Sequence, residues 1–264
     1  MSRINDKVYS ELMKVSCTTA WGVLGTILRD PLVRDSYRMM KVRPLNPTYR
    51  VCGPALTVRY IAYDPLNPTI EAQNLQDAYQ SKIEEITEAI NPGDVVVAAA
   101  LGRVDAGVFG DGICTGFKAK GASGVVVDGS LRDMPVIRKL NFPVFTIGPG
   151  TPTTAAYHIH DGKPSGVLPA EVNVPVICDG VRVRPGDFII GDEDGVMVIP
   201  SEYVEDVARL GGAVEDVENV ERKLILEGKL VHGQMMSEEQ AREHGILEQW
   251  KLVRDVRTHG IYRR

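Results

Sequence analysis

Two acidic residues and an arginine stand at the ends of short apolar runs in the middle of the chain. Asp111 lies in a glycine-bracketed loop after the run GVF, and Arg132 and Asp133 follow the run GVVVDGSL. In sheets built from alternating strands and helices, ligands bind at the carboxyl ends of the strands, where such loops lie. These three side chains are therefore the first candidates for chemistry. The alternative is that they form a plain salt-linked pair of surface turns.

The residue types at these strand ends favour binding of an anionic substrate beside a hard metal ion. A site with one or two carboxylates and no Cys or His cluster suits Mg²⁺ or Mn²⁺ rather than zinc. Arg132 could bind a substrate carboxylate or a developing oxyanion. The backbone amides of residues 110–113 open a predicted helix and form a plausible anion cradle.

The elements that must position these residues follow from the hydrophobic pattern. Residues 94–147 alternate short apolar strands with helical segments, which predicts parallel strands joined by crossovers. Residues 8–29 are predicted to form one helix, and residues 50–63 a strand pair with a break at Gly-Pro. A helix over 70–90 should end at Asn-Pro-Gly. Short strands with turn residues between 174 and 200 predict hairpins, and a charged helix follows with two consecutive glycines as its weak point.

Composition bounds the function and the setting of the protein. The chain has 264 residues and a net charge of −5, which does not support a nucleic-acid partner. The four cysteines (Cys17, Cys52, Cys114 and Cys178) lack metal or disulfide spacing. No apolar run reaches the length of a membrane span, and the first residues lack the apolar stretch of a signal peptide. We expect no membrane partner, a cytoplasmic protein and one domain over 1–264.

Several stretches give the chain a resemblance to a known family. VRPLNPTYRVCGPALTV, NPGDVVV, GVVVDGSLRD, VNVPVICDGVRVRPGD and IIGDEDGVMVIP resemble the class II pyruvate aldolases that act on 4-hydroxy-4-methyl-2-oxoglutarate and 4-carboxy-4-hydroxy-2-oxoadipate. That family also contains the RraA proteins, regulators of ribonuclease E. The likeness covers residues 40–230. The aldolase branch is marked by an Asp, twenty intervening residues and Arg-Asp, the spacing of Asp111 and Arg132-Asp133 here.

The resemblance implies a fold and an assembly. The fold would be an α/β domain of the swivelling β/β/α type, with a mixed sheet and helical extensions at both termini. The assembly would be a homotrimer or a homohexamer whose active sites lie between subunits. A Glu from a neighbouring subunit would complete each site, and Glu215 and Glu218 are the positions that match it. Both could instead be solvated charges on a helix.

The resemblance also implies a division of roles among the central residues. Asp133 would bind Mg²⁺ or Mn²⁺ directly, and Asp111 would hold a metal-bound water. Arg132 would stabilise the enolate that forms as the carbon–carbon bond breaks, a fixed cation aimed at developing negative charge. The substrate carboxylate would be received by backbone amides of the loop, those of Gly110, Asp111, Gly112 and Ile113.

Three functions follow from this reading. The first is a metal-dependent aldolase that releases pyruvate from a 4-hydroxy-2-oxo acid. The second is a decarboxylase of oxaloacetate or a related 2-oxo acid, which passes through the same pyruvate enolate. The third is a non-catalytic regulator that binds ribonuclease E, and the presence of Asp111 argues against it.

His158 and His160 alternate as in a strand and could bind metal, although this spacing is more typical of surface or packing residues. They lie in a segment longer than the family's, which could line the pocket.

Overall fold

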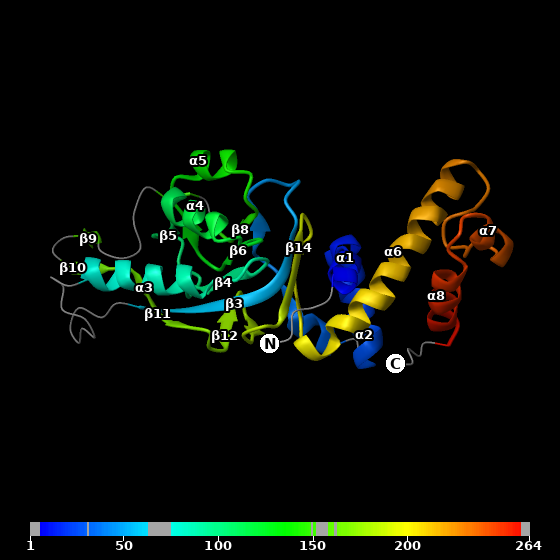
Figure 1. The fold of residues 1–264 in the computed structure, drawn as a ribbon, viewed down its shortest axis with the longest axis horizontal. Coiled ribbons are helices and arrows are strands. Elements are labelled where there is room, and N and C mark those ends of the chain that lie inside the picture. Colours follow the sequence, from blue (N-terminus) through cyan, green and yellow to red (C-terminus); the bar gives the residue numbers. More distant parts are fainter. Residues whose placement is uncertain are drawn as a thin grey trace. The chain divides into compact units, whose positions relative to one another are not determined.

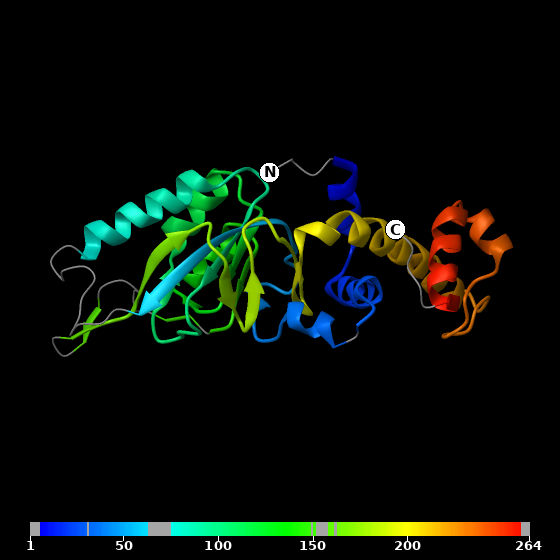
Figure 2. The same cartoon turned by 90° about the horizontal axis from the view of Figure 1, so that it is seen from below.

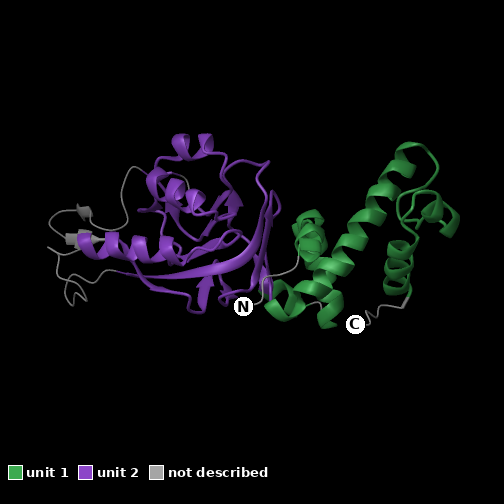
Figure 3. Cartoon of the chain, in the orientation of Figure 1, with its two compact units in different colours: residues 1–36, 201–264 green, residues 37–200 purple. Residues whose placement is uncertain are grey.

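The computed structural model describes residues 6–30, 32–62, 75–148, 150–151, 158–160 and 163–259. Their contacts divide the chain into two compact units (Figure 3). Residues 37–200 form one unit, and residues 1–36 together with 201–264 form the other. Each unit has a hydrophobic core of its own. The expectation of one domain over 1–264 stays a prediction, because compactness does not show whether either unit folds without the other.

A mixed sheet forms the centre of the 37–200 unit (Figure 1). Parallel pairings join four strands in the order β3, β4, β6 and β8. Antiparallel strands extend this group, and β11 pairs with the second half of β3. The sheet confirms the predicted α/β class and the parallel strands within residues 94–147. Its strands are β1 (Arg38–Met39), β2 (Arg43–Pro44), β3 (Val51–Ala62), β4 (Val95–Ala99), β6 (Gly124–Val127), β8 (Val144–Thr146), β11 (Val167–Val172), β14 (Phe188–Asp192) and β15 (Gly195–Ile199).

The parallel strands are buried on both faces, which explains their continuous apolar runs. Val96 and Ala98 of β4 pack into a core with three helices, and Val95 and Val97 belong to a second core on the opposite face. The helices lie on one side of the sheet and β12 on the other (Figures 1 and 2). The elements that cover the two faces are α3 (Leu75–Ala89), α4 (Asp111–Ala119) and α5 (Met134–Lys139), and the antiparallel pair β12 (Val176–Cys178) and β13 (Val181–Val183).

The strand β3 is continuous, so the predicted break at Gly53-Pro54 was wrong. Pro54 costs the strand one donor, but the next residue restores the pairing, since the Ala55 N–H donates to the Asp187 carbonyl at 2.8 Å. Gly53 does not interrupt the strand; it allows another segment to pack closely against it. A Cβ at this position would overlap the carbonyl oxygen of Gly93, so the turn that ends the α3 segment packs directly on the β3 backbone. The missing side chain is a packing requirement.

The other unit consists of helices around a small core. The predicted helix over 8–29 is two helices, because Ser16 caps the second one: its hydroxyl accepts the Thr19 N–H at 3.1 Å. The long helix α6 passes through Gly211-Gly212 without a break. A Cβ on Gly211 would lie 2.8 Å from the side chain of Val15, so the glycines allow α1 to approach closely. The elements are α1 (Asp6–Lys14), α2 (Cys17–Leu28), η3 (Ser201–Tyr203), α6 (Val204–Leu226), α7 (Glu238–Glu243) and α8 (Leu247–His259), with η1 (Val33–Tyr37) at the change of unit.

Among the described residues, no helix is both long enough and apolar enough to cross a membrane.

The close approach at Gly53 can be tested by stability. Gly53→Ala should lower the free energy of unfolding by about 1–3 kcal/mol, the usual cost of overpacking, because a backbone carbonyl cannot move aside cheaply. Urea unfolding followed by circular dichroism measures the change. Gly116→Ala is the control: nothing lies within 4 Å of its added Cβ inside α4, and it should stabilise by about 0.5–1 kcal/mol. A Gly53→Ala protein as stable as its parent would contradict the packing.

Candidate active site

Parallel pairing of two short strands brings the predicted site residues together. β5 (Gly107–Phe109) and β7 (Ser130–Leu131) form a two-stranded sheet, and the Arg132 N–H continues it by donating to the Phe109 carbonyl at 3.0 Å. Parallel strands end at the same edge. The loop that follows β5 therefore lies beside the loop that follows β7, although twenty residues separate Asp111 from Arg132 in the chain.

Gly110 is the point at which these two loops meet. A Cβ on Gly110 would lie 2.8 Å from Oδ2 of Asp133 and 2.9 Å from Nε of Arg132. The two charged side chains also contact each other, with Arg132 Nε 3.3 Å from Asp133 Oδ2. Both are partly open to solvent, at 42% and 38% of their side-chain surface. The glycine thus provides the space in which a cation and a carboxylate are held side by side.

The backbone of Asp133 turns its carboxylate toward this space. Asp133 has φ 59° and ψ 27°, the left-handed region that few residues other than glycine adopt. It is the N-cap of α5, yet its side chain makes no capping hydrogen bond. An aspartate at an N-cap ordinarily accepts an N–H of its own helix. The carboxylate is thus directed to Arg132 and Gly110 instead, and unusual backbone conformations of this kind cluster at functional sites.

A buried carboxylate anchors the turn that leads into β7. Asp128, at the end of β6, accepts the backbone N–H of Ala100 and, at 3.1 Å, that of Asp179. Burial raises the pKa of Asp128, and the two backbone N–H groups oppose that rise. The Ser130 N–H donates to the Arg103 carbonyl at 2.9 Å. These bonds fix the path of the chain from the central sheet to Arg132.

The first turn of α4 offers backbone donors beside these charges. Its first helical hydrogen bond runs from the Cys114 N–H to the Gly110 carbonyl at 3.1 Å. The N–H groups of Asp111, Gly112 and Ile113 precede that bond, so the helix provides no acceptor for them. They stand at the positive end of the helix dipole, where a carboxylate or phosphate binds well. The anion cradle at residues 110–113 stays a prediction.

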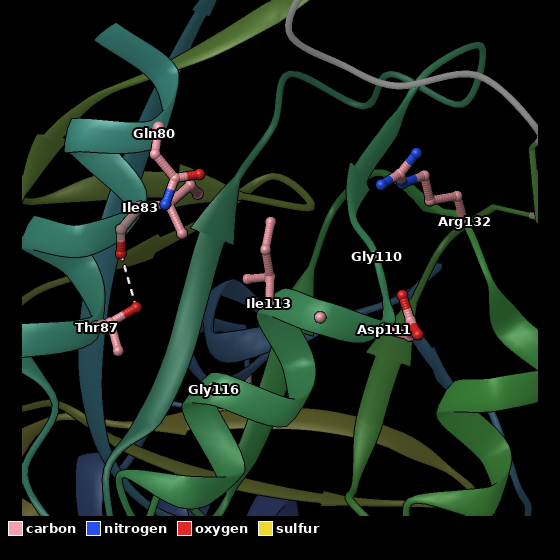
Figure 4. A pocket seen from close by; sticks show the side chains of 9 residues that line it. Gln80, Ile83, Thr87, Gly110, Asp111, Ile113, Gly116 and Arg132 are labelled. Carbon is pink, nitrogen blue, oxygen red and sulfur yellow. Dashed lines mark hydrogen bonds between the residues drawn. The ribbon is translucent and has the colours of Figure 1, made fainter. Parts of the chain in front are cut away.

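A hollow of about 320 Å³ opens at this edge of the unit (Figure 4). Arg132 and Asp111 line one side of it, and helix α3 lines the other. Asp133 lies next to the hollow without lining it. The lining residues are Gln80, Ile83, Thr87, Gly110, Asp111, Gly112, Ile113, Gly116 and Arg132.

The α3 residues of this hollow were not anticipated from the sequence. Gln80, Ile83 and Thr87 have the spacing i, i+3, i+7, which places them on one face of a helix. That periodicity is visible in the sequence. It does not show that the face borders Asp111, because α3 and α4 meet only through the fold.

The two aspartates fit a hard divalent cation that keeps several waters. Their carboxylate oxygens are the candidate metal ligands where the two strand ends meet, and hard cations prefer oxygen ligands. Within the described ranges, no group of three or more His, Cys, Asp and Glu side chains is placed to hold a metal ion. A site with a complete set of protein ligands, as structural zinc requires, is therefore not present among those residues.

Glu215 and Glu218 belong to the other compact unit, on α6. Glu215 is engaged there: its Oε1 accepts the Ser16 N–H at 3.0 Å, and only 12% of its side chain is exposed. Burial alone would raise the pKa of Glu215, but the bonds from Ser16 and Thr19 and the charge of Arg222 outweigh it and lower the pKa. Glu218 is 37% exposed and lies 3.4 Å from Arg222.

Two antiparallel strand pairs contain the remaining histidine and acidic residues of interest. His158–His160 form β9, which pairs with β10 (Lys163–Ser165), and the side chains of these strands lie outside the described residues. β14 and β15 form one of the hairpins predicted between 174 and 200, and in its turn the Asp194 N–H donates to Asp192 Oδ1 at 3.0 Å.

The sequence that forms this mixed α/β unit matches a known family. Residues 14–198 match the RraA-like family model, Aldolase/RraA, and the chain therefore belongs to that family. A protein of Halalkalibacterium halodurans, provisionally named 4-hydroxy-4-methyl-2-oxoglutarate aldolase, is 38% identical over 63% of this chain and 67% of its own. The 4-hydroxy-4-methyl-2-oxoglutarate aldolase of Thermus thermophilus is 30% identical over 45% of this chain and 66% of its own length. The chain thus spans about two thirds of these relatives.

Solved structures agree on the fold. Streptomyces coelicolor RraAS2, described as an unusual member of the RNase ES inhibitor RraA protein family, superposes with a TM-score of 0.67 at 28% identity. It covers 84% of this chain and 98% of its own. An uncharacterized protein of Pseudomonas syringae gives the same TM-score at 24% identity, over 92% of this chain and 100% of its own. The predicted family and RraA-like fold are confirmed.

The thiol of Cys114, three residues from Asp111, should be unreactive in the folded protein. Burial, with the charge of Asp111, raises the pKa of Cys114 to about 12. At pH 8 a pKa four units higher leaves roughly one thiol in ten thousand ionised, and only the thiolate is a good nucleophile. Native protein treated with iodoacetamide should carry no label at Cys114 by mass spectrometry, while protein unfolded in guanidinium should be labelled fully. Rapid native labelling would contradict this burial.

Proposed function

We propose that the chain is a divalent-metal-dependent aldolase that cleaves a 4-hydroxy-2-oxo acid to pyruvate and a second carbonyl compound. The observation that carries the proposal is the convergence of Asp111, Arg132 and Asp133 around Gly110, beside the amides that open α4. The names of the aldolase relatives support the same reading. A surface salt link would need neither the left-handed Asp133 nor the adjoining hollow.

Different groups of the chain would bind different parts of the substrate. The amides of residues 111–113 would receive the substrate carboxylate, since they lack acceptors within α4. Asp133 directly, and Asp111 through a water, would hold Mg²⁺ or Mn²⁺, which when bound supplies Lewis acidity toward the oxygens of the pyruvyl unit. Arg132 would face the enolate oxygen, so that its charge is most favourable when negative charge develops there.

The reaction balances without an oxidant or reductant. The C4 hydroxyl loses its proton, the electron pair of the C3–C4 bond passes into the enolate, and C4 leaves as a carbonyl. A proton at C3 then completes the methyl group of pyruvate. Oxaloacetate decarboxylation would pass through the same enolate, with carbon dioxide as the leaving fragment, and is proposed as a side activity.

A neighbouring subunit of a trimer or hexamer is proposed to complete the site with a glutamate. Glu218 suits this role better than Glu215, whose carboxylate is already bonded to the start of α2. Glu218 is more exposed, and its partners are flexible arginines rather than a backbone N–H. The ligand of the protein would then be a small-molecule 2-oxo acid. We expect the protein to act in the cytoplasm. The rival role, a regulator of an RNA-degrading enzyme, would leave Asp111 and the anion cradle without a use.

Metal dependence should follow the two aspartates. Exhaustive chelation should abolish pyruvate release, and Mg²⁺ or Mn²⁺ should restore it. Asp133→Asn should abolish turnover through loss of a charged ligand. Asp111→Asn should reduce activity about 10- to 100-fold, as for groups that act through a ligand. A lactate-dehydrogenase-coupled assay measures pyruvate, and Mn²⁺ titration followed by electron paramagnetic resonance separates lost metal from lost fold. Full activity after chelation, or greater damage from Asp111→Asn at saturating Mg²⁺, would contradict these roles.

Arg132→Lys should mainly slow the chemical step. Lysine keeps the charge but loses the planar fork of guanidinium. If the contact is strongest in the transition state, kcat should fall about 10²- to 10³-fold, while KM changes much less. Exchange of the pyruvate methyl protons with deuterium, followed by NMR, should slow as well because it passes through the same enolate. A large rise in KM with kcat intact would show that Arg132 only anchors a substrate carboxylate.

A further inference from the structure

The wall of the hollow that faces the charged groups is formed by α3, and it carries no charge of its own. Gln80, Ile83 and Thr87 contribute an amide, a branched alkyl group and a hydroxyl (Figure 4). Among the lining residues, the charges are those of Asp111 and Arg132, both on the opposite side. The part of a ligand that lies against α3 therefore meets neutral groups.

The hydrogen-bonding capacity of this wall is mostly that of an acceptor. One N–H of the Gln80 amide donates to Glu84 Oε1 at 3.2 Å, which leaves one N–H and the amide oxygen for a ligand. The Thr87 hydroxyl donates to the Ile83 carbonyl at 2.7 Å, so its proton is already used within the helix. A carboxylate needs several donors, and here it would meet one N–H and two acceptor oxygens.

The surroundings of the wall disfavour a second anion still further. Helix α3 carries four acidic residues and one lysine, and that lysine, Lys82, is paired with Glu85 at 2.5 Å. Ile83 is buried and Ile113 packs against the same core, which gives the hollow an apolar floor. A methyl or hydroxyalkyl group can be buried here, while an unpaired carboxylate would lose its hydration without compensation.

From this wall we infer the substrate class: a 4-hydroxy-2-oxo acid whose C4 substituent is uncharged, with Gln80 and Thr87 of α3 as the specificity-determining residues. The inference rests on the proposed aldolase function. The second product would be a neutral aldehyde or ketone, rather than a second 2-oxo acid. This distinguishes the chain from its relatives named for 4-hydroxy-4-methyl-2-oxoglutarate, a dianion.

A matched pair of substrates tests the inference on the full-length protein with Mg²⁺. The compounds 4-hydroxy-2-oxopentanoate and 4-hydroxy-2-oxoglutarate differ at C5, where one has a methyl group and the other a carboxylate. We expect kcat/KM to favour the neutral compound by at least about tenfold, since a carboxylate against this wall loses hydration that the wall does not replace. A preference for the dianion would overturn the inference.

A charge added to the wall tests the role of α3. Gln80→Lys combined with Glu84→Gln, which prevents an internal ion pair, should raise kcat/KM for the dianion about tenfold or more, the range of a hydrogen bond to a charged group. The neutral substrate should be affected little. The control combines Ser81→Lys with Glu84→Gln: Ser81 is exposed and does not line the hollow, yet the charge change is the same. Equal effects of the two double variants would overturn the assignment to Gln80.

Binding of unreactive analogues separates this inference from the aldolase proposal. 2-Oxopentanoate and 2-oxoglutarate lack the C4 hydroxyl and cannot undergo the cleavage. Calorimetry with Mg²⁺ should show tighter binding of 2-oxopentanoate in the parent protein and a shift toward 2-oxoglutarate in the protein with both Gln80→Lys and Glu84→Gln. If binding shifts in this way but the hydroxy acids release no pyruvate, the specificity role of α3 is supported and the proposed aldolase function is overturned. Absence of binding by both analogues would overturn both.

Discussion

The site depends on one close approach, made possible because Gly110 has no side chain. Parallel pairing of β5 with β7 brings two strand ends to the same edge, and the carboxylate of Asp133 and the guanidinium of Arg132 then occupy the volume where a Cβ would be. With any larger residue at position 110, one of the two charged groups would have to move. The rest of the candidate chemistry, from helix amides to hollow, is arranged around this contact.

The central sheet supplies the rigidity that such a contact needs. β4, β6 and β8 are buried on both faces, and Asp128 ties the end of β6 to neighbouring backbone N–H groups. Burial of that carboxylate is unfavourable unless it is hydrogen-bonded, so the bonds to Ala100 and Asp179 are part of its stability. Burial raises the pKa of Asp128, and the same hydrogen bonds that anchor the turn oppose that rise. The same anchoring leaves the turn toward Arg132 little freedom.

The other unit uses small residues and caps in the same manner. Gly211 and Gly212 allow α1 to lie close to α6, and Glu215 bonds the backbone at the start of α2. A carboxylate near a helix N-terminus is favourable for both its hydrogen bond and the helix dipole. This local role of Glu215 directs attention to Glu218 as the glutamate available for a neighbouring subunit.

The sequence by itself determined the alternation of strands and helices over residues 94–147, because buried parallel strands must be apolar on both faces. It also made Asp111, Arg132 and Asp133 candidates, because charged residues that follow apolar strands stand at strand ends, where ligands bind in such sheets. It failed at Ser16 and at Gly53-Pro54, where local propensity was read without the partners that override it. Ser16 caps a second helix, and pairing with β14 carries β3 through Gly53-Pro54. Only the tertiary structure decided that α3 forms the wall opposite Arg132. Helical periodicity defines a face, but which element that face meets depends on crossover packing between segments distant in the chain.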